Sequence, residues 1–208
     1  MRVLALGAHF DDVELGCGGT LLKHKENGDE INILCVTHSE YENKSCNFIR
    51  TKDEARSEGE RSARRLGATL HCMDMAPLVL IPTEQLVLQI ENLVNEIKPD
   101  RVYTHSPTDN HADHATVGYV SVRACRKCKE ILLYRSNWYI IDTPDNDNYY
   151  VDITSQFAEK KEILLLFESE MRKCNNSWID FVEQQNKAAG AKIGSGYAET
   201  FSVIKMVW

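Results

Sequence analysis

Residues 2–14 of the chain read RVLALGAHFDDVE, an unbroken apolar run followed directly by imidazole and carboxylate side chains. A continuous apolar run such as residues 2–8 is typical of a strand that is buried on both faces of a parallel sheet. The run is too short for the core of a signal peptide, and no suitable cleavage site follows it. We therefore expect a first strand that delivers His9, Asp11 and Asp12 to the carboxyl edge of a sheet.

The order of the later segments predicts the architecture. Apolar runs alternate with segments that have helical spacing, and this rhythm is typical of a doubly wound sheet. The predicted strands cover residues 30–37, 69–73, 101–104, 130–134 and 149–153. The predicted helices cover residues 19–25, 53–66, 83–98, 121–130 and 154–170. We predict an α/β fold, one domain over residues 1–208, with a Rossmann-like, mostly parallel sheet and helices on both faces.

A second group of metal-binding residue types follows the fourth predicted strand: His111, Asp113 and His114. In a doubly wound sheet of Rossmann order, the first and fourth strands are neighbours where the connection reverses, and ligands bind outside their carboxyl ends. The two groups are therefore predicted to converge. His105 lies six residues before His111, and we expect it to line the same pocket rather than to bind a metal.

Three imidazoles and three aspartates at one point favour a divalent metal site with a separate general base. His9 and Asp12 are three residues apart in a tight turn, so their side chains can point into one volume. His111 and His114 have the same spacing and would share a face in the first turn of a helix. One histidine of this second pair would complete a His/Asp/His site with a vacant position, as a catalytic zinc ion requires.

The remaining groups suit the other roles of a hydrolytic site. Asp11 could act as general base toward water that a metal activates. The other histidine of the second pair could stabilise a developing oxyanion, and Asp113 could orient that imidazole. Each aspartate also has a structural interpretation, because Asp11, Asp12 and Asp113 are of a residue type favoured at helix N-caps. All of these structural interpretations would have to hold at once for the site to be absent.

Residues 16–19, GCGG, follow the first strand and suggest a dinucleotide-binding turn. Such a fingerprint lies in the strand-to-helix turn itself. Here the eight residues 8–15 intervene, and four of them are acidic or imidazole side chains that would meet a pyrophosphate. We predict instead that these glycines allow a helix to pack closely on the sheet.

The composition excludes several classes of partner. The 208 residues carry a net charge of −7 with no block rich in lysine or arginine, so we expect no binding to nucleic acids or acidic membranes. No apolar stretch approaches the ~18 residues of a membrane span. The seven cysteines are odd in number and scattered, which indicates free thiols in a reducing cytoplasm. Cys125 and Cys128 have no second pair nearby to complete a zinc site.

Two motifs resemble the signatures of the PIG-L/LmbE-like family of zinc-dependent N-acetylglucosaminyl deacetylases. Residues 8–14, AHFDDVE, match the family's Ala-His-x-Asp-Asp-x-Glu pattern, and residues 109–114, DNHADH, match its Asp-x-His-x-Asp-His pattern. Weaker echoes are DEA at residues 53–55 and the closing segment 196–201, GYAETF. The resemblance implies the zinc ligands His9, Asp12 and His114, the general base Asp11, the oxyanion stabiliser His111, and Asp113 in support of His111.

The sequence departs from the family pattern at a few positions. Phe10 and Ala112 stand where proline is common, and neither side chain does chemistry. Family members often have a substrate-contacting arginine three residues before the Glu-Ala of the charged helix. Here that position is Thr51, with Arg50 one place away. We expect the arginines at 50, 56, 61 and 64 to lie mostly on the solvated face of this helix, where only one near its N-terminal end could reach a sugar hydroxyl or an acidic group.

The resemblance implies a hydrolase of linear amide bonds, which removes the N-acetyl group from an N-acetylglucosamine-type sugar or small glycoconjugate. It implies Zn²⁺ as the cofactor, although Fe²⁺ or Co²⁺ would also suit such ligands. Two alternatives stay open. One is an amidase that cleaves a thiol conjugate of an amino-sugar cofactor, and the other is a sugar- or nucleotide-binding α/β protein without catalysis.

The residues that select the substrate are expected in the segment 133–150, whose aromatic side chains could stack on a sugar ring or simply pack in the fold. They are Tyr134, Trp138, Tyr139, Tyr149 and Tyr150. The apolar segment 201–208 is compatible with a homo-oligomer.

Overall fold

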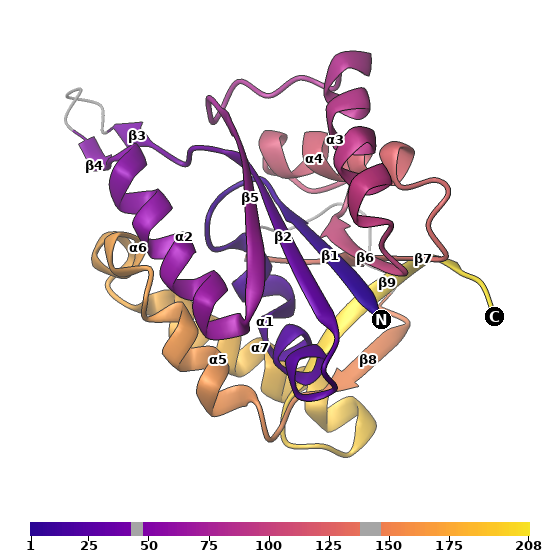
Figure 1. Ribbon diagram of the computed structural model, residues 1–208. Helices are drawn as coiled ribbons and strands as arrows, with labels where there is room; N and C mark the ends of the chain where they lie inside the picture. Colours follow the sequence, from indigo (N-terminus) through magenta and orange to yellow (C-terminus); the bar gives the residue numbers. More distant parts are fainter. Residues whose placement is uncertain (43–47, 138–146) are drawn as a thin grey trace.

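The computed structural model describes residues 1–42, 48–137 and 147–208, and seven of its strands form one sheet (Figure 1). These strands are β1 (Arg2–Gly7), β2 (Glu30–Thr37), β5 (Ala68–Met75), β6 (Arg101–His105), β7 (Glu130–Tyr134), β8 (Tyr149–Asp152) and β9 (Ala198–Met206). They lie in the order β5-β2-β1-β6-β7-β9-β8. The first five are mutually parallel, whereas β9 is antiparallel to both of its neighbours. The predicted mostly parallel sheet is confirmed.

Helices cover both faces of the sheet, because the central strands are apolar at successive positions. In β1, Leu4 and Leu6 face one layer, whereas Val3 and Ala5 face the other. The first layer contains α3 (Glu84–Ile97) and α4 (Ala112–Ala124). The second layer contains α1 (Asp12–Glu26), α2 (Lys52–Leu66) and α5 (Phe157–Leu164). The predicted α/β architecture with helices on both faces is confirmed.

The first and fourth predicted strands, β1 and β6, are neighbours in the sheet, with Val3 opposite Arg101 and Ala5 opposite Tyr103. Strands β2 and β5 continue the sheet on one side of this pair, and β7 continues it on the other. The connection therefore reverses between β1 and β6, as the sequence predicts. The segments that follow these two strands leave the same edge of the sheet, where a doubly wound fold binds its ligands.

Helix α1 is broken near its middle, and a buried ion pair stabilises the break. Cys17 has φ −142° and ψ 18°, so two helical segments meet there, and the predicted helix 19–25 is the second of them. The amides of Gly19 and Thr20 donate to the Glu199 carboxylate over 2.8 and 2.7 Å. Lys160 Nζ lies 2.6 Å from the same carboxylate, and both charged side chains are buried. Strand β9 thus caps the second half of the first helix.

Gly16 lies directly against the sheet. A Cβ at this position would come 2.1 Å from Cδ2 of Tyr134 in β7, so no larger residue fits without displacement of the ring. The predicted close packing of helix on sheet is confirmed at this position. Tyr134 is itself a packing residue, because its hydroxyl is buried and donates to the carbonyl oxygen of Leu6 over 2.7 Å.

The segment 154–170 forms two helices rather than the predicted one. Helix α5 ends at Leu164, and α6 (Glu168–Cys174) begins after Phe167, whose φ of −86° and ψ of 61° are not helical. Phe167 is fully buried beside Phe10 and Ala55. The chain therefore leaves the helical path where a large side chain must turn into the core.

The predicted helix over residues 121–130 is correct up to Ala124 and wrong beyond it. Helix α4 ends at Ala124, and the chain reaches β7 through a turn in which Cys128 N–H donates to the carbonyl oxygen of Cys125. The elements that were not predicted include strand β9, helix α7 (Ser177–Ile193) and the short hairpin strands β3 (Tyr41–Glu42) and β4 (Phe48–Arg50).

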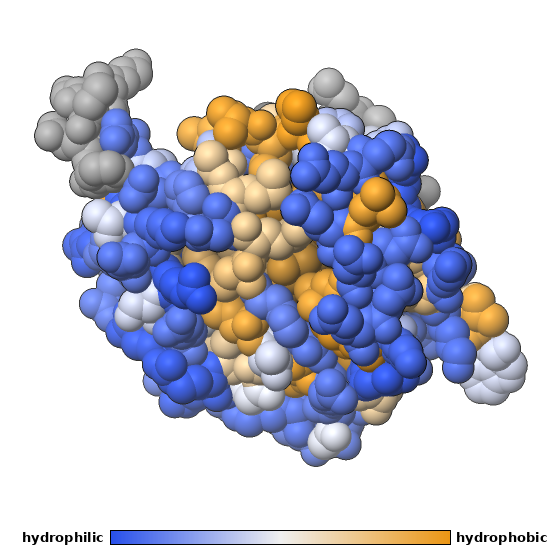
Figure 2. All heavy atoms as spheres, turned by 45° about the horizontal axis from the view of Figure 1, so that its top comes forward, coloured by the Kyte–Doolittle hydropathy of each residue, from blue (hydrophilic) through white to orange (hydrophobic). Residues whose placement is uncertain are grey.

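Most of the apolar segment 201–208 belongs to the sheet, because β9 extends to Met206 and pairs with β7 and β8. Its last residues still expose hydrophobic side chains, namely Ile204, Met206, Val207 and Trp208. Figure 2 shows a further band of hydrophobic residues down the middle of the face that β5 forms. Leu78, Val79 and Ile81, on the loop after β5, are about two-thirds exposed. Among the described helices, none combines the length and apolar character that a membrane crossing requires.

Candidate active site

The turn between β1 and α1 places three predicted site residues at the carboxyl edge of the sheet. Asp11 has φ 126° and ψ −27°, a strained conformation that residues with a side chain rarely adopt. His9 and Asp12 flank it, and His9 N–H donates to Asp12 Oδ2 over 2.7 Å. Asp11 occupies the N-cap position of α1, but its side chain makes no capping hydrogen bond. Its carboxylate is therefore used elsewhere.

The three predicted metal ligands lie at the corners of a small triangle. His9 Nδ1 is 3.2 Å from His114 Nε2, which is 3.1 Å from Asp12 Oδ1. The third side, from His9 Nδ1 to Asp12 Oδ2, measures 3.4 Å. Two ligands of a tetrahedral zinc ion, each about 2.1 Å from it, are roughly 3.4 Å apart. The donor set and its spacing therefore fit a divalent transition-metal ion with little movement.

Two further histidines lie beside this triangle. Donor atoms of His9, His111 and His114 lie within 4.8 Å of one another, and so do donor atoms of Asp12, His105 and His114. The ring of His111 stacks on that of His114 with centroids 4.3 Å apart. His105 Nε2 lies 3.1 Å from Asp12 Oδ2, and this side chain is fully buried. His105 therefore contacts a predicted ligand instead of lining the pocket as expected.

Asp113 orients His9. Its Oδ2 lies 3.1 Å from His9 Nε2, on the opposite side of the ring from the predicted metal-binding nitrogen. The amides of Leu78 and Leu80 donate to the Asp113 carboxylate over 2.6 and 3.3 Å and fix its position. The sequence predicts support for His111, whereas the described hydrogen bonds of Asp113 run to His9 and to the loop after β5. A carboxylate in this place sets the tautomer of a metal-binding imidazole.

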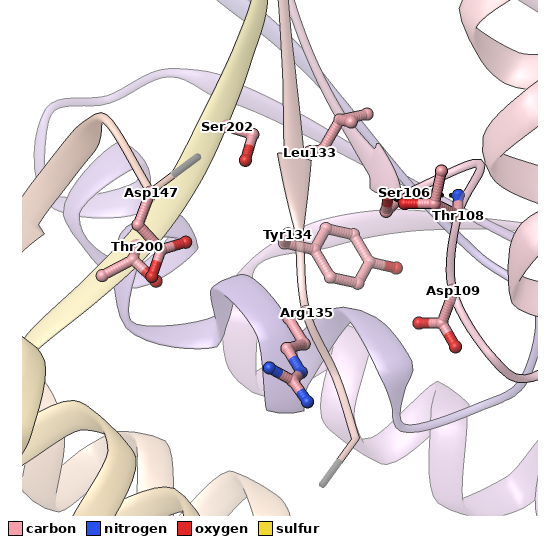
Figure 3. A pocket seen from close by; sticks show the side chains of 9 residues that line it. All are labelled: Ser106, Thr108, Asp109, Leu133, Tyr134, Arg135, Asp147, Thr200 and Ser202. Carbon is pink, nitrogen blue, oxygen red and sulfur yellow. Dashed lines mark hydrogen bonds between the residues drawn. The ribbon is translucent and has the colours of Figure 1, made fainter. Parts of the chain in front are cut away.

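His114 also has a carboxylate partner, that of Asp109, to which the sequence analysis gave no role. Asp109 Oδ2 lies 3.4 Å from His114 Nδ1, and Asn137 Nδ2 donates to both oxygens of Asp109 over 3.0 and 3.1 Å. The signal was present, because Asp109 opens the second motif. Asp109 also borders a separate small cavity of about 20 Å³, in which Figure 3 shows Arg135 on the opposite side.

Arg50 is buried within the site, and its predicted position on a solvated helix face is wrong. It lies outside the helix, because β4 ends with it and α2 starts two residues later, and it is 1% exposed. Its Nη1 lies 3.1 Å from Asp11 Oδ2 and 3.4 Å from Glu170 Oε1. Its Nη2 lies 3.1 Å from Glu58 Oε2. The candidate base Asp11 is therefore held by a buried guanidinium.

Burial and neighbouring charges separate the pKa values of the two aspartates. Burial raises the pKa of Asp11 well above its usual value, and the charge of Arg50 offsets part of this rise. Burial acts on Asp12 in the same direction, but the adjacent His114 and His105 hold the pKa of Asp12 well below its usual value. Asp12 is thus ionised, as a metal ligand must be, whereas Asp11 can hold a proton.

The pKa values of His9 and His114, at two corners of the triangle, also differ from that of His111 beside it. Burial lowers the pKa of His111 to about 4, and the nearby charges of His114 and His9 add to the effect. Its imidazole is therefore neutral at neutral pH. Burial also disfavours protonation of His9 and His114, but their carboxylate partners outweigh it and raise the pKa values to about 9 and about 10. The carboxylates thus favour a positive charge between His9 and His114, whether a proton or a metal ion carries it.

These groups line a cavity of about 250 Å³. Its other walls come from the β3 hairpin, the loop after β5, and helices α6 and α7, and they include Tyr41, Leu78, Glu170, Lys173 and Trp178. None of these five residues was predicted, because they come from segments remote in sequence from both motifs.

The aromatic residues that line the described cavity are not those expected from the segment 133–150. Tyr149 and Tyr150 lie in β8, at the edge of the sheet, and the described cavity is lined instead by Tyr41 and Trp178. Tyr134 packs against α1, as described above. The two remaining aromatic residues of this prediction, Trp138 and Tyr139, lie outside the described residues.

Comparisons with known proteins bear on this site. The profile of the PIG-L family, described as GlcNAc-PI de-N-acetylase, matches residues 4–125. The chain is 32% identical over 145 residues to the uncharacterized deacetylase YaiS of Escherichia coli (strain K12), across 65% of this chain and 75% of that protein. It is 26% identical over 224 residues to the diacetylchitobiose deacetylase of Thermococcus kodakarensis, across 95% of this chain and 81% of that protein.

A solved structure has the same fold. The N,N′-diacetylchitobiose deacetylase from Pyrococcus horikoshii superposes with a TM-score of 0.84 and 22% sequence identity. The superposition covers 98% of this chain and 83% of that chain. The shared fold therefore includes the segments that carry both motifs and the helices that wall the cavity.

Proposed function

The chain belongs to the PIG-L family of de-N-acetylases, and from this membership we propose that it removes the N-acetyl group from an N-acetylglucosamine-type amino sugar or a small glycoconjugate. The observation that carries the proposal is the triangle of donor atoms, 3.1–3.4 Å apart, from His9, Asp12 and His114. A buried carboxylate, Asp11, adjoins it at the same cavity. A protein that only binds sugars has no need of a metal-ligand set and a base together.

We assign His9, Asp12 and His114 as ligands of a divalent ion, with Zn²⁺ as the first candidate and Fe²⁺ or Co²⁺ as alternatives. When bound, such an ion supplies Lewis acidity toward water and toward the acetyl carbonyl. Asp113 holds the outer nitrogen of His9, and Asp109 contacts that of His114. Both rings are thus oriented by the protein itself, which favours tight binding at these donors.

Asp11 is the proposed general base. Arg50 contacts its Oδ2, so Oδ1 would take a proton from the attacking water and later deliver it to the departing amine. The oxygen of that water joins the acetyl carbon, the amide C–N bond breaks, and acetate and the free amino sugar result. His111, neutral and 4.3 Å from the His114 ring centroid, would donate its N–H to the carbonyl oxygen as negative charge develops.

Acetate release tests the proposal. Metal-stripped protein, and the same protein given back Zn²⁺, are assayed on a panel of N-acetylglucosamine derivatives while metal content is measured. We expect release only with metal. His114→Ala should lose the metal, and Asp11→Asn should keep it but lose most turnover. His71→Ala is the matched control, because His71 is half-buried in β5 and does not line the cavity.

The outcomes separate the parts of the proposal. Full metal content in His114→Ala would overturn the ligand assignment, and normal turnover by Asp11→Asn would overturn the base assignment. Failure of the metal-loaded wild type to release acetate from any derivative would count against the deacetylase itself.

Three sequence predictions accompany this function as proposals. They are one domain over residues 1–208, a cytoplasmic location, and assembly into a homo-oligomer. Candidates for subunit contacts are the exposed hydrophobic residues of the loop after β5 and those at the end of the segment 201–208. They are Leu78, Val79 and Ile81 in the loop, and Ile204, Met206, Val207 and Trp208 in the segment. Light scattering during size-exclusion chromatography measures the oligomeric state directly.

A further inference from the structure

The charged residues that line the cavity are mostly acidic. The carboxylates are Asp11, Asp12, Glu40, Glu42 and Glu170. The positive charges among the described lining residues are Arg50 and Lys173 and, at the reacting end, the charge between His9 and His114. Asp11 and Asp12 belong to the reacting end of the cavity. The other three carboxylates stand on the walls, where the rest of a substrate would lie.

The charge of Arg50 is already neutralised by the protein. Its guanidinium contacts three carboxylates, those of Asp11 at 3.1 Å, Glu58 at 3.1 Å and Glu170 at 3.4 Å. It is 1% exposed, and both of its terminal nitrogens also donate to the carbonyl oxygen of Phe10. Even when Asp11 holds a proton, two negative charges face this one positive charge, which leaves no net attraction for an anionic group of a substrate.

Lys173 is committed in the same way. Its Nζ lies 3.2 Å from Glu170 Oε2 and 4.1 Å from the ring centroid of Tyr41. Glu40 and Glu42 stand on the neighbouring wall, and the hydrogen bond that Glu40 accepts comes from a neutral amide, that of Lys52. The walls beyond the reacting end therefore carry a net negative charge in the described part of the chain.

Arg135 does not add a positive charge to the walls of the large cavity. It lines the separate small cavity of Figure 3, which Asp109 also borders. Its guanidinium is drawn there among Tyr134, Asp109 and Asp147 and not among the residues of the large cavity.

We infer that the cavity accepts N-acetylated sugars that are uncharged or carry a free amine, and that it discriminates against sugars that carry phosphate or carboxylate groups. Carboxylates that meet no spare cation among the described residues repel an anion at close range, and like-charge placement of this kind is how binding sites reject wrong ligands. The inference rests on the proposed function, whose substrate class it narrows.

Matched pairs of sugars test it with the Zn²⁺-loaded protein. N-acetylglucosamine is compared with its 6-phosphate, and N,N′-diacetylchitobiose with its singly deacetylated form. We expect kcat/KM for the 6-phosphate to be at least tenfold below that for N-acetylglucosamine, and the free amine to be tolerated. High salt should bring the kcat/KM values for N-acetylglucosamine and its 6-phosphate closer together, because it screens repulsion at the partly exposed wall.

A charge-reversal variant tests whether the acidic wall of the cavity causes the difference in kcat/KM between the two sugars. Glu42 is exposed and has no part in the proposed chemistry, so Glu42→Lys should raise kcat/KM for the 6-phosphate relative to that for N-acetylglucosamine at least threefold. The control is Glu96→Lys on α3, which changes the net charge by the same amount away from the cavity and should leave the ratio unchanged.

The outcomes distinguish this inference from the proposed function. Equal efficiency on the phosphorylated and unphosphorylated sugars would overturn the inference while the deacetylase stands, and so would an unchanged ratio in Glu42→Lys. If no sugar releases acetate, the deacetylase fails. Titration calorimetry with glucosamine and glucosamine 6-phosphate then still tests the charge preference, and tighter binding of the phosphate would overturn it.

Discussion

Replacement of Glu199 by glutamine should destabilise the fold strongly. The Glu199 carboxylate accepts hydrogen bonds from the amides of Gly19 and Thr20 and lies 2.6 Å from Lys160 Nζ. A glutamine keeps the shape, but one of its terminal atoms becomes a donor. That atom would face either the ammonium group or the amides of α1, which are donors too. If it faces the ammonium group, the fully buried Lys160 keeps only the Leu15 carbonyl and the Asn186 amide oxygen as partners among the described residues.

The size of the loss follows from the burial of the pair. Breaking a buried ion pair from one side costs about 3–5 kcal/mol. For a chain of this size, each kcal/mol lowers Tm by roughly 2–4 °C, so we expect a drop of about 6–20 °C. An exposed pair provides the control: Arg56 and Glu60, whose side chains are 50% and 47% exposed, lie 3.2 Å apart on α2. Glu60→Gln should cost no more than about 0.5 kcal/mol.

Urea denaturation measures the free energy of unfolding of each variant. The variants are Glu199→Gln, Lys160→Met, the double variant that combines them, and the control Glu60→Gln. We expect the double variant to lose less stability than the sum of its single changes, because no charge is then left unpaired. A loss below about 1 kcal/mol in Glu199→Gln would refute the reasoning. Strict additivity in the double variant would refute it as well.

Three further variants test the site and its support. Asp113→Asn should weaken metal binding about 10–100-fold, because it removes the partner that orients an imidazole ligand; competition with a chelator measures this, and unchanged affinity would contradict the assignment. Asp11→Asn should lower turnover about 10²–10⁴-fold at full metal occupancy, whereas a smaller loss would point to another base. Gly16→Ala should cost about 1–3 kcal/mol in denaturant titrations, because its Cβ would come 2.1 Å from a buried ring. Gly18→Ala, whose nearest contact would be 3.7 Å, should be tolerated, and equal losses would contradict the packing argument.

The order of the parallel strands could be predicted because it depends on local patterns. Each buried strand is a short apolar run, each helix has its own apolar stripe, and the switch point follows from their alternation. The meeting of the two motifs was predictable for the same reason, whereas the choice of His114 rather than His111 as a proposed ligand came from the family resemblance. His9, Asp12 and His114 stand in short motifs at the ends of two strands that must be neighbours.

The residues that sequence reasoning misplaced have partners far along the chain. Arg50 looked like part of a solvated helix, and only its contacts with Asp11 and Glu170 explain its burial. Asp113 was paired with its sequence neighbour His111, whereas folding brings His9 to it. A hydrophobic pattern reports which face of an element is buried, but it does not report which charged groups meet there.

The position of β9 has a consequence for how the protein is made. This strand lies between β7 and β8, yet it follows both in the sequence. At about 5–20 residues per second, a ribosome needs roughly 3–13 s to translate from the end of β7 to the start of β9. A nascent chain that folds early exposes the open edge of β7 throughout that interval. Such an edge can pair with a strand of another chain, so aggregation during synthesis depends on how fast this stretch is translated.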